Sequence, residues 1–241
     1  MSQSLYRIVQ TALLVGLFIF LGMKVITHQL TWYINARFAI IVEMGIVFLA
    51  ILVYRLILEI RHASPDHEDR PVVSPLNLFI MLIPLLVGLL IPARPLGSSA
   101  ISAKGFNLSS PLISSKAAGQ QFETESEQRT IMDWLNLFQI EDDLNPLMGQ
   151  KASVVGFVYH DPRLSAGQFF VSRIVISCCA ADGFPVVMMV DWPEAAALKP
   201  DTWVRVSGPV DQVQFNKQAL PLIHAKTVEV VPQPDQPYLF P

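Results

Sequence analysis

The sequence predicts a membrane protein in two parts. An anchor of three transmembrane helices is followed by a mainly-β C-terminal domain, an OB-like five-stranded barrel with an amphipathic helix before it. Only 15% of the 241 residues are charged, against roughly 25% in soluble domains. Nearly all long apolar runs precede Arg94, and the segments after Lys151 alternate between β-rich runs and turn residues.

Each of the predicted membrane helices, about 5–26, 36–58 and 73–93, is centred on an apolar run. The first and third runs contain no charged side chain between their flanking basic residues, and the second contains only Glu43. The lengths of these runs are close to the about 20 residues that a helix needs to span a bilayer. A signal peptide is the alternative for the first run, but "KVITHQL" lacks the small residues of a cleavage site, so we predict an uncleaved anchor.

The basic residues predict the orientation of these helices. Arg55, Arg61 and Arg70 lie near the segment between the second and third helices, whereas "THQLTWYIN", between the first and second, has no Lys or Arg. By the positive-inside rule, residues 59–73 are cytoplasmic, and the third crossing carries the chain after Ala93 to the outer side. This predicts a multi-pass protein whose C-terminal domain is extracytoplasmic.

Changes in composition divide the chain into three parts. Residues 1–94 are predicted to form the transmembrane domain, residues 95–122 a linker rich in Ser, Gly and Ala, and residues 123–241 the outer domain. The linker has no long apolar run of its own, so we expect it to be an irregular connection.

An amphipathic helix is predicted at the start of the outer domain, over 127–140. In "TESEQRTIMDWLNLFQI", Ile131 and Phe138 fall on one face at helical spacing. Thr124 and Glu127 have the spacing of a capping box, which would place the start of the helix there.

Five strand-like segments follow this helix. They are "KASVVGFVYH", "QFFVSRIVISCC", "FPVVMMVDW", "DTWVRVSGPVDQVQF" and "LPLIHAKTVEVV", and the Ala-rich "PEAAALKP" lies between the third and the fourth. Five strands with a helical piece in that place are the element order of an OB-type barrel. A small β-sandwich is the alternative.

Several stretches resemble one family. "GFVYHDPRLSAGQFFVSRIVISCCAADGFPV", "WVRVSG" and the terminal "PQPDQPYLFP" are similar to the YcgQ-like family of uncharacterised bacterial membrane proteins, as are "WYINARF" and "IPARPLGS". The resemblance implies a subunit of a two-component membrane permease complex in the bacterial cell (inner) membrane, with a larger multi-spanning permease as partner. It brings no assigned active site.

The chain has two cysteines, Cys178 and Cys179, just before Asp182. Neighbours in a regular strand point to opposite faces, so both thiols face one ligand only if the strand breaks, as the Asp-Gly turn permits. These three residues are the candidate binding site; a soft metal (Zn or Cu), a disulfide and simple packing all stay open. His160 lies on the order of 30 Å away along the hairpin, a poor co-ligand. His224 has no predicted place, and no spacing matches a zinc motif.

Charge and motifs argue against two classes of function. Residues 94–241 carry 11 Lys and Arg against 15 Asp and Glu, a net charge of −4, which argues against nucleic acid as a partner. No nucleophile elbow, P-loop, dinucleotide fingerprint or H-E-x-x-H motif is present, so we predict no enzymatic activity and name no catalytic residue.

The leading hypothesis is an accessory subunit of a membrane permease, whose outer domain binds substrate or caps the partner. Glu43 is the polar residue embedded in the membrane. One acid on three helices makes no ion relay, so we expect Glu43 to contact the partner or Arg37 within the lipid bilayer. The alternative is a membrane-tethered metal- or thiol-handling module centred on Cys178 and Cys179. A structural protein of the cell envelope is a third possibility.

Overall fold

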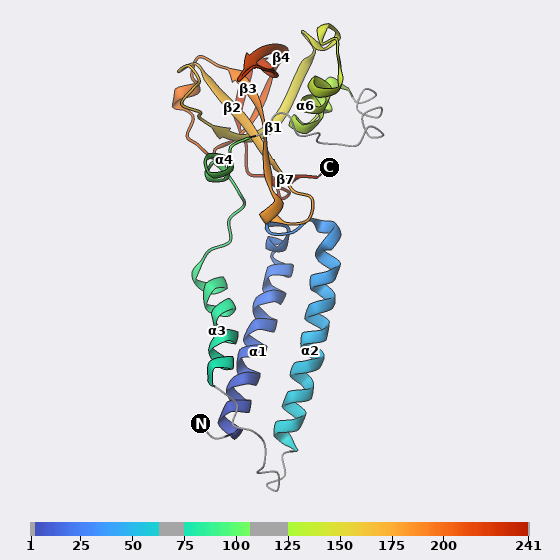
Figure 1. Cartoon of the computed structure of the whole chain (residues 1–241), viewed down its shortest axis with the longest axis vertical. Coiled ribbons are helices and arrows are strands. Elements are labelled where there is room, and N and C mark those ends of the chain that lie inside the picture. The colour runs from blue at the N-terminus through green and yellow to red at the C-terminus, as the bar shows by residue number, and fades with distance from the viewer. Residues whose placement is uncertain (1–2, 63–74, 107–124, 241) are drawn as a thin grey trace. The chain divides into compact units, whose positions relative to one another are not determined.

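The computed structural model describes residues 3–62, 75–106 and 125–240 (Figure 1). The chain divides into two compact units, residues 1–94 and 95–241. The first unit is helical and the second is mainly β.

The N-terminal unit contains three helices: α1 (Gln3–Ile26), α2 (Ala39–Arg61) and α3 (Pro75–Leu90). The segments Leu5–Ile26 and Ala36–Arg61 are long and apolar enough to cross a membrane. Large apolar side chains cover their outer surfaces, and Phe48 on α2 is 69% exposed within the unit. Such a surface is unfavourable in water and favourable in lipid.

Helix α3 is shorter than the predicted third span. It ends at Leu90 rather than at 93, because Ile91 precedes Pro92 and a residue before proline is disfavoured in the α region. The predicted start at 73 lies outside the described residues. The 16 residues of α3 extend about 24 Å, less than the about 30 Å of a bilayer core. The described anchor therefore has two helices of spanning length and one shorter apolar helix.

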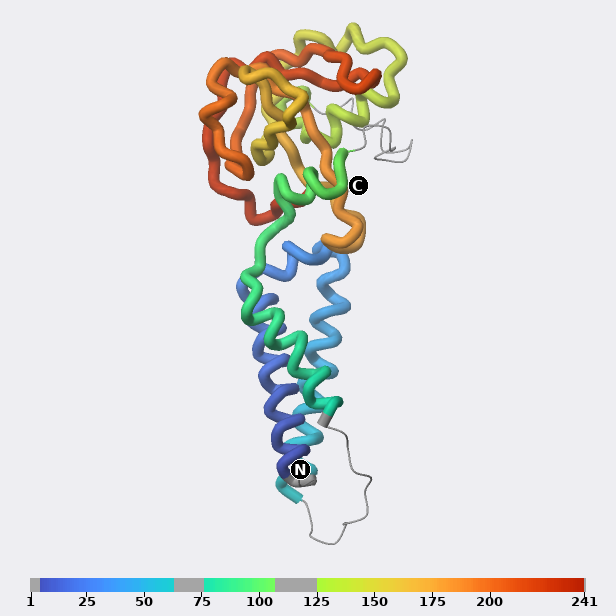
Figure 2. The backbone as a smooth tube through the Cα atoms, turned by 60° about the vertical axis from the view of Figure 1, so that its left-hand side comes forward, coloured from blue at the N-terminus to red at the C-terminus, as the bar shows by residue number. Residues whose placement is uncertain are grey.

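The C-terminal unit is built on a sheet in which five strands close into a ring (Figures 1 and 2). The strands are β1 (Lys151–Tyr159), β2 (Gln168–Val175), β3 (Phe184–Asp191), β4 (Trp203–Phe215), β5 (Gln218–His224), β6 (Thr227–Val230) and β7 (Tyr238–Leu239). The ring runs β1–β2–β3–β5–β4 and returns to β1. Neighbours in the ring are antiparallel except β3 and β5, which are parallel.

All five predicted strand segments contain strands, and the structure has two further strands, β6 and β7. The last segment divides near Ala225 into β5 and β6, and β6 pairs with the first half of β4. The C-terminal tail, for which we predicted no strand, supplies β7, which pairs parallel with β2. The Ala-rich piece between β3 and β4 is a single 3₁₀ turn, Ala195–Ala197.

Helix α6 (Ile131–Ile140) buries its apolar side chains in the main core of this unit. Trp134 is fully buried among residues of the ring strands. The predicted start at 127 is wrong, because the helix begins after Thr130, which forms a capping box with Asp133. Thr130 and Asp133 exchange side-chain and backbone hydrogen bonds at this end. The other candidate cap, Thr124, lies outside the described residues.

Part of the segment predicted as a linker is helical. Helix α4 (Ser98–Lys104) buries Ile101, which is 1% exposed, against Phe157 and Tyr238. The carboxylate of Asp201 accepts hydrogen bonds from the Ser98 amide at 2.6 Å and the Ser98 hydroxyl at 2.7 Å. Residues 95–106 therefore belong to the C-terminal unit, and the rest of the predicted linker lies outside the described residues.

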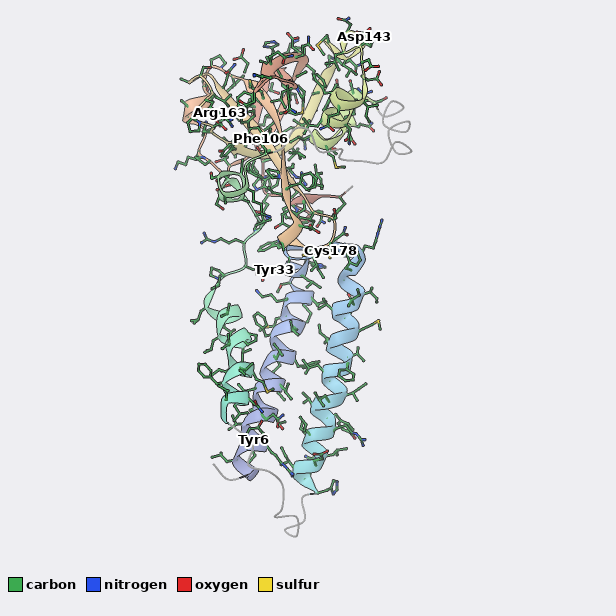
Figure 3. The ribbon with its side chains drawn as sticks, in the orientation of Figure 1. Tyr6, Tyr33, Phe106, Asp143, Arg163 and Cys178 are labelled. Carbon is green, nitrogen blue, oxygen red and sulfur yellow. The ribbon has the colours of Figure 1, made fainter. Side chains whose placement is uncertain are left out.

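The loop between β1 and β2 is fixed by an ion pair between Asp161 and Arg163. The guanidinium donates from Nε to Asp161 Oδ1 at 2.7 Å and lies 4.7 Å from the centre of the Phe215 ring. It also lies 5.6 Å from the centre of the Phe106 ring; Figure 3 labels Arg163 and Phe106. These hydrogen bonds hold the pKa of Asp161 below its ordinary value.

Asp161→Asn is expected to lower the free energy of unfolding by about 1 kcal/mol at pH 7, a modest figure because the Arg163 side chain is half exposed. The folded pKa is lower than the unfolded one, so the stabilisation is fully present above the unfolded pKa and is lost as pH falls through the folded pKa. Urea unfolding of both proteins between pH 7 and pH 3 measures this. A difference that stays constant over this range would contradict the assignment.

Candidate functional site

The two cysteines lie in the loop between β2 and β3. Strand β2 ends at Val175, and the loop passes through a 3₁₀ turn, Ala180–Asp182, before β3 begins at Phe184. The regular alternation of side chains therefore stops before Cys178. This is the break that the sequence requires for both thiols to face one ligand.

The Asp182 carboxylate organises this loop. It accepts three consecutive backbone amides, from Ser177 at 3.1 Å, Cys178 at 2.7 Å and Cys179 at 3.3 Å. In return, the Asp182 amide donates to the Cys179 sulfur, so the two residues form a capping box. Successive amides that converge on one carboxylate make a compact nest, which fixes the backbone under both cysteines.

The geometry brings the three predicted binding residues together. Cys178 is exposed and Cys179 is half-buried, and both are free thiols (Figure 3 labels Cys178). One ligand atom each from Cys178, Cys179 and Asp182 lie within 4.8 Å of one another. Two sulfurs and a carboxylate oxygen at this separation can bind a metal ion or react with a thiol reagent.

Lys104, the last residue of α4, holds the other side of the loop. Its ammonium group donates to the carbonyl of Ala181 at 3.0 Å and to that of Gly183 at 2.9 Å. A Cβ on Gly183 would lie 2.9 Å from a methyl group of Leu96. The loop is thus fixed from inside by Asp182 and from outside by the segment that leads into the unit.

The local environment disfavours ionisation of Cys178. Partial desolvation raises the pKa of the Cys178 thiol, and the neighbouring Cys179 thiol and Asp182 carboxylate raise it further. Because the thiolate is the nucleophile, iodoacetamide should alkylate Cys178 with a pH midpoint above that of a free cysteine peptide.

Mass spectrometry of the modified peptides at several pH values measures this midpoint. Modification of Cys178 should also exceed that of half-buried Cys179 at short times. A midpoint below that of the peptide would contradict the proposed environment.

The two histidines considered as ligands lie elsewhere, and so do the neighbouring methionines of β3. His160 is engaged through Nε2 with the carbonyl of Leu198 at 2.8 Å, just beyond the end of β1 that pairs with Phe170. His224 lies beside Asp191, at the opposite end of β3 from the cysteine loop. Met188 and Met189 are buried in the ring.

Two important residues were missed by sequence reasoning. Arg173 is 8% exposed and binds the C-terminal tail, and Lys104 binds the cysteine loop. A signal for Arg173 was present, since it is the one charge within the apolar "QFFVSRIVIS". Lys104 carried no such signal, because its contact joins positions almost 80 residues apart.

Comparison with known proteins covers both units. Residues 9–107 match the DUF1980 N-terminal domain, and residues 115–241 match the DUF1980 C-terminal domain. The chain belongs to the DUF1980 family. The predicted YcgQ-like family is thereby confirmed, because DUF1980 relatives include the "UPF0703 protein YcgQ" of Bacillus subtilis (strain 168).

Two DUF1980 relatives align over nearly their whole length. The YcgQ protein is 22% identical over an alignment 261 positions long, which covers 88% of this chain and 92% of the relative. A protein of Streptococcus mutans serotype c (strain ATCC 700610 / UA159) is 25% identical over an alignment 264 positions long, which covers 91% of this chain and 94% of the relative. It is named "Putative two-component membrane permease complex subunit". No solved structure matches the chain.

Proposed function

We propose that this chain is an accessory subunit of a two-component membrane permease complex in the bacterial cell (inner) membrane. The observation that carries the proposal is the alignment over 91% of the chain with a streptococcal protein of that name. The helical unit supports it, because α1 and the Ala36–Arg61 segment have the length and composition of membrane spans.

The partner in this proposal is a multi-spanning permease subunit. Few helices and one acidic residue within their apolar runs, Glu43, cannot line a polar path across the bilayer. Glu43 lies on an exposed face of α2, among large apolar side chains that are also exposed within the unit. Such a face is suited to a neighbouring membrane helix, with Glu43 as its polar contact, and to the surrounding lipid.

The C-terminal unit, residues 95–241, is called the β unit below. It is proposed to be extracytoplasmic and to bind substrate or cap the outer opening of the partner. An outer location requires a third crossing by α3, and the apolar run "PVVSPLNLFIMLIPLLVGLLIPA" is long enough for one. The ring order, with β3 and β5 parallel and a turn between β3 and β4, supports an OB-like barrel. We propose neither enzymatic activity nor nucleic-acid binding for it.

Co-purification tests the complex. A tagged chain, extracted from its native membrane in mild detergent, should bring with it one multi-spanning protein at constant stoichiometry. A variant with Glu43→Gln should retain less of this companion, and Glu59→Gln, near the end of α2, should retain it fully. A chain recovered alone at every detergent concentration would contradict the proposal.

A second function is favoured by the cysteine loop: a membrane-tethered module that handles a metal ion or a thiol. Its support is the convergence of the Cys178, Cys179 and Asp182 ligand atoms within 4.8 Å. The Cys178→Ser, Cys179→Ser double variant separates the two functions. A subunit that only docks should keep its partner and its transport activity, whereas a thiol module should lose activity and remain folded.

A further inference from the structure

We propose that the cysteine loop binds one cuprous ion between the Cys178 and Cys179 thiolates, with Asp182 and Lys104 as positioning residues. The inference rests on the proposed function in one respect, since it names a ligand for the β unit of the permease subunit. Its support is that the sulfur atoms of the loop are accessible, whereas the carboxylate oxygens of Asp182 already accept hydrogen bonds.

The sulfurs are the donors that the loop leaves most available, since the Cys179 sulfur accepts one amide, that of Asp182, whereas the carboxylate accepts three. The Asp182 carboxylate accepts the amides of Ser177, Cys178 and Cys179, so both of its oxygens are engaged in holding the backbone. The thiols lie on the accessible side, with Cys178 exposed and Cys179 half-buried. The loop therefore offers two soft ligands on a backbone that is already fixed.

Two sulfurs suit a monovalent soft ion better than zinc. Structural zinc takes four ligands in a tetrahedron, and catalytic zinc takes three from the protein. Within the described part of the chain, the only group of three or more metal-binding side chains is this one, and its carboxylate is engaged. Thiolates bind cuprous copper as well as zinc, so the small number of ligands, and not their softness, favours the cuprous ion here.

The separation of the ligand atoms agrees with a two-sulfur site. With metal–sulfur bonds of about 2.3 Å, two sulfurs on opposite sides of one ion lie at most about 4.6 Å apart. The two Sγ atoms lie within the 4.8 Å that encloses the whole group. Binding therefore requires adjustment of the two side chains, without refolding of the loop.

The charge balance also favours this site. Two thiols lose two protons when one cuprous ion binds, so the copper–dithiolate unit carries one negative charge, next to that of Asp182, and no electron is transferred. The ammonium group of Lys104 lies on the same loop, on the carbonyls of Ala181 and Gly183. A positive charge at that position stabilises the loaded state and connects it to α4, the segment that follows the third membrane helix.

Anaerobic titration of the full-length chain in detergent with cuprous ion, against a chromophoric cuprous chelator, tests the proposal. The wild type should take one ion per chain and show a sulfur-to-copper absorption band in the near ultraviolet. Cys178→Ser and Cys179→Ser should each abolish both signals. Met148→Leu removes the one methionine sulfur of the β unit that is not buried, and should bind as the wild type does.

The positioning residues have their own expected results. Asp182→Asn and Lys104→Met should keep one ion per chain but bind it about 10- to 100-fold more weakly, in the range found for groups that orient metal ligands. Lys104→Arg keeps the positive charge and should therefore bind the cuprous ion almost as tightly as the wild type, unlike Lys104→Met. Thermal unfolding of each variant separates weaker binding from loss of the fold.

Two results would overturn the proposal: equal copper binding by the wild type and the double serine variant, or displacement of the copper by an equal concentration of zinc. The partner can be followed in the same preparations. Failure of the wild-type chain to bind copper, with the permease partner retained, refutes this site alone, whereas copper binding by a wild-type chain from which no partner co-purifies refutes the subunit proposal alone.

Discussion

Arg173→Ala is expected to destabilise the C-terminal unit by about 3 kcal/mol and to release its C-terminal tail. Arg173 donates from Nε to the carbonyl of Pro237 at 3.0 Å and from Nη2 to that of Gln236 at 2.9 Å. Its guanidinium also lies 5.2 Å from the centre of the Trp203 ring. Removal leaves these carbonyls without their donor and opens a cavity beneath β7.

The burial of this cation explains why the effect is large. Burial lowers the pKa of Arg173 to about 10, so the group stays charged at neutral pH at an energetic penalty. Backbone carbonyls and the face of the Trp203 ring compensate for this penalty. A charged side chain that stays buried at such a penalty is expected to bind a specific partner. For Arg173 this partner is the C-terminal tail.

Urea unfolding of the full chain, followed by tryptophan fluorescence, measures the loss of stability. Hydrogen exchange of the peptide that covers 236–240 should become fast in Arg173→Ala while exchange in β2 and β3 stays slow. Arg205→Ala on β4 is the matched control, since this arginine is exposed, and should change stability by less than about 0.5 kcal/mol. An equal effect of the two changes would refute the role of Arg173.

Gly156→Ala is the second change with a large expected effect, a loss of about 3 kcal/mol or more. A Cβ at Gly156 of β1 would lie 2.5 Å from the carbonyl oxygen of Ser172 on β2 and 2.9 Å from a methyl group of Val171. A backbone oxygen of a central strand cannot move away as a flexible side chain can. The ring must therefore open between β1 and β2, or the protein fails to fold.

Gly167→Ala is the matched control for this change. A Cβ at Gly167 would come no closer than 3.8 Å to its nearest neighbour, the carbonyl of Trp192, so the variant should be as stable as the wild type. Thermal unfolding and the yield of folded protein compare the two. Normal stability of Gly156→Ala would show that β1 and β2 are further apart than described.

Local pattern predicted the elements of this protein more fully than their connections. The apolar runs at 5–26 and 36–58 and the five strand segments are visible in the sequence, because each depends on residues that are neighbours in the chain. The third helix was predicted too long, since the apolar run continues past the point where Pro92 ends the helix.

The contacts that build the site join distant parts of the chain. Helix α4 lies within a Ser- and Ala-rich segment and is held by Asp201 and by burial of Ile101 against the last residues, which no local pattern reports. The tail strand β7 depends in the same way on Arg173. Convergence of the two thiols depended on where β2 ends, and the sequence showed only that a break was possible there.

The central claim is that the membrane helices carry the β unit, with its thiols, to the outer side of the membrane. Alkaline phosphatase, which becomes active only outside the cytoplasm, can be fused after Pro241 and, as the internal control, after Arg61. We predict high activity for the fusion after Pro241 and none for the fusion after Arg61. Activity of the Arg61 fusion alone would place the β unit in the cytoplasm and contradict the account.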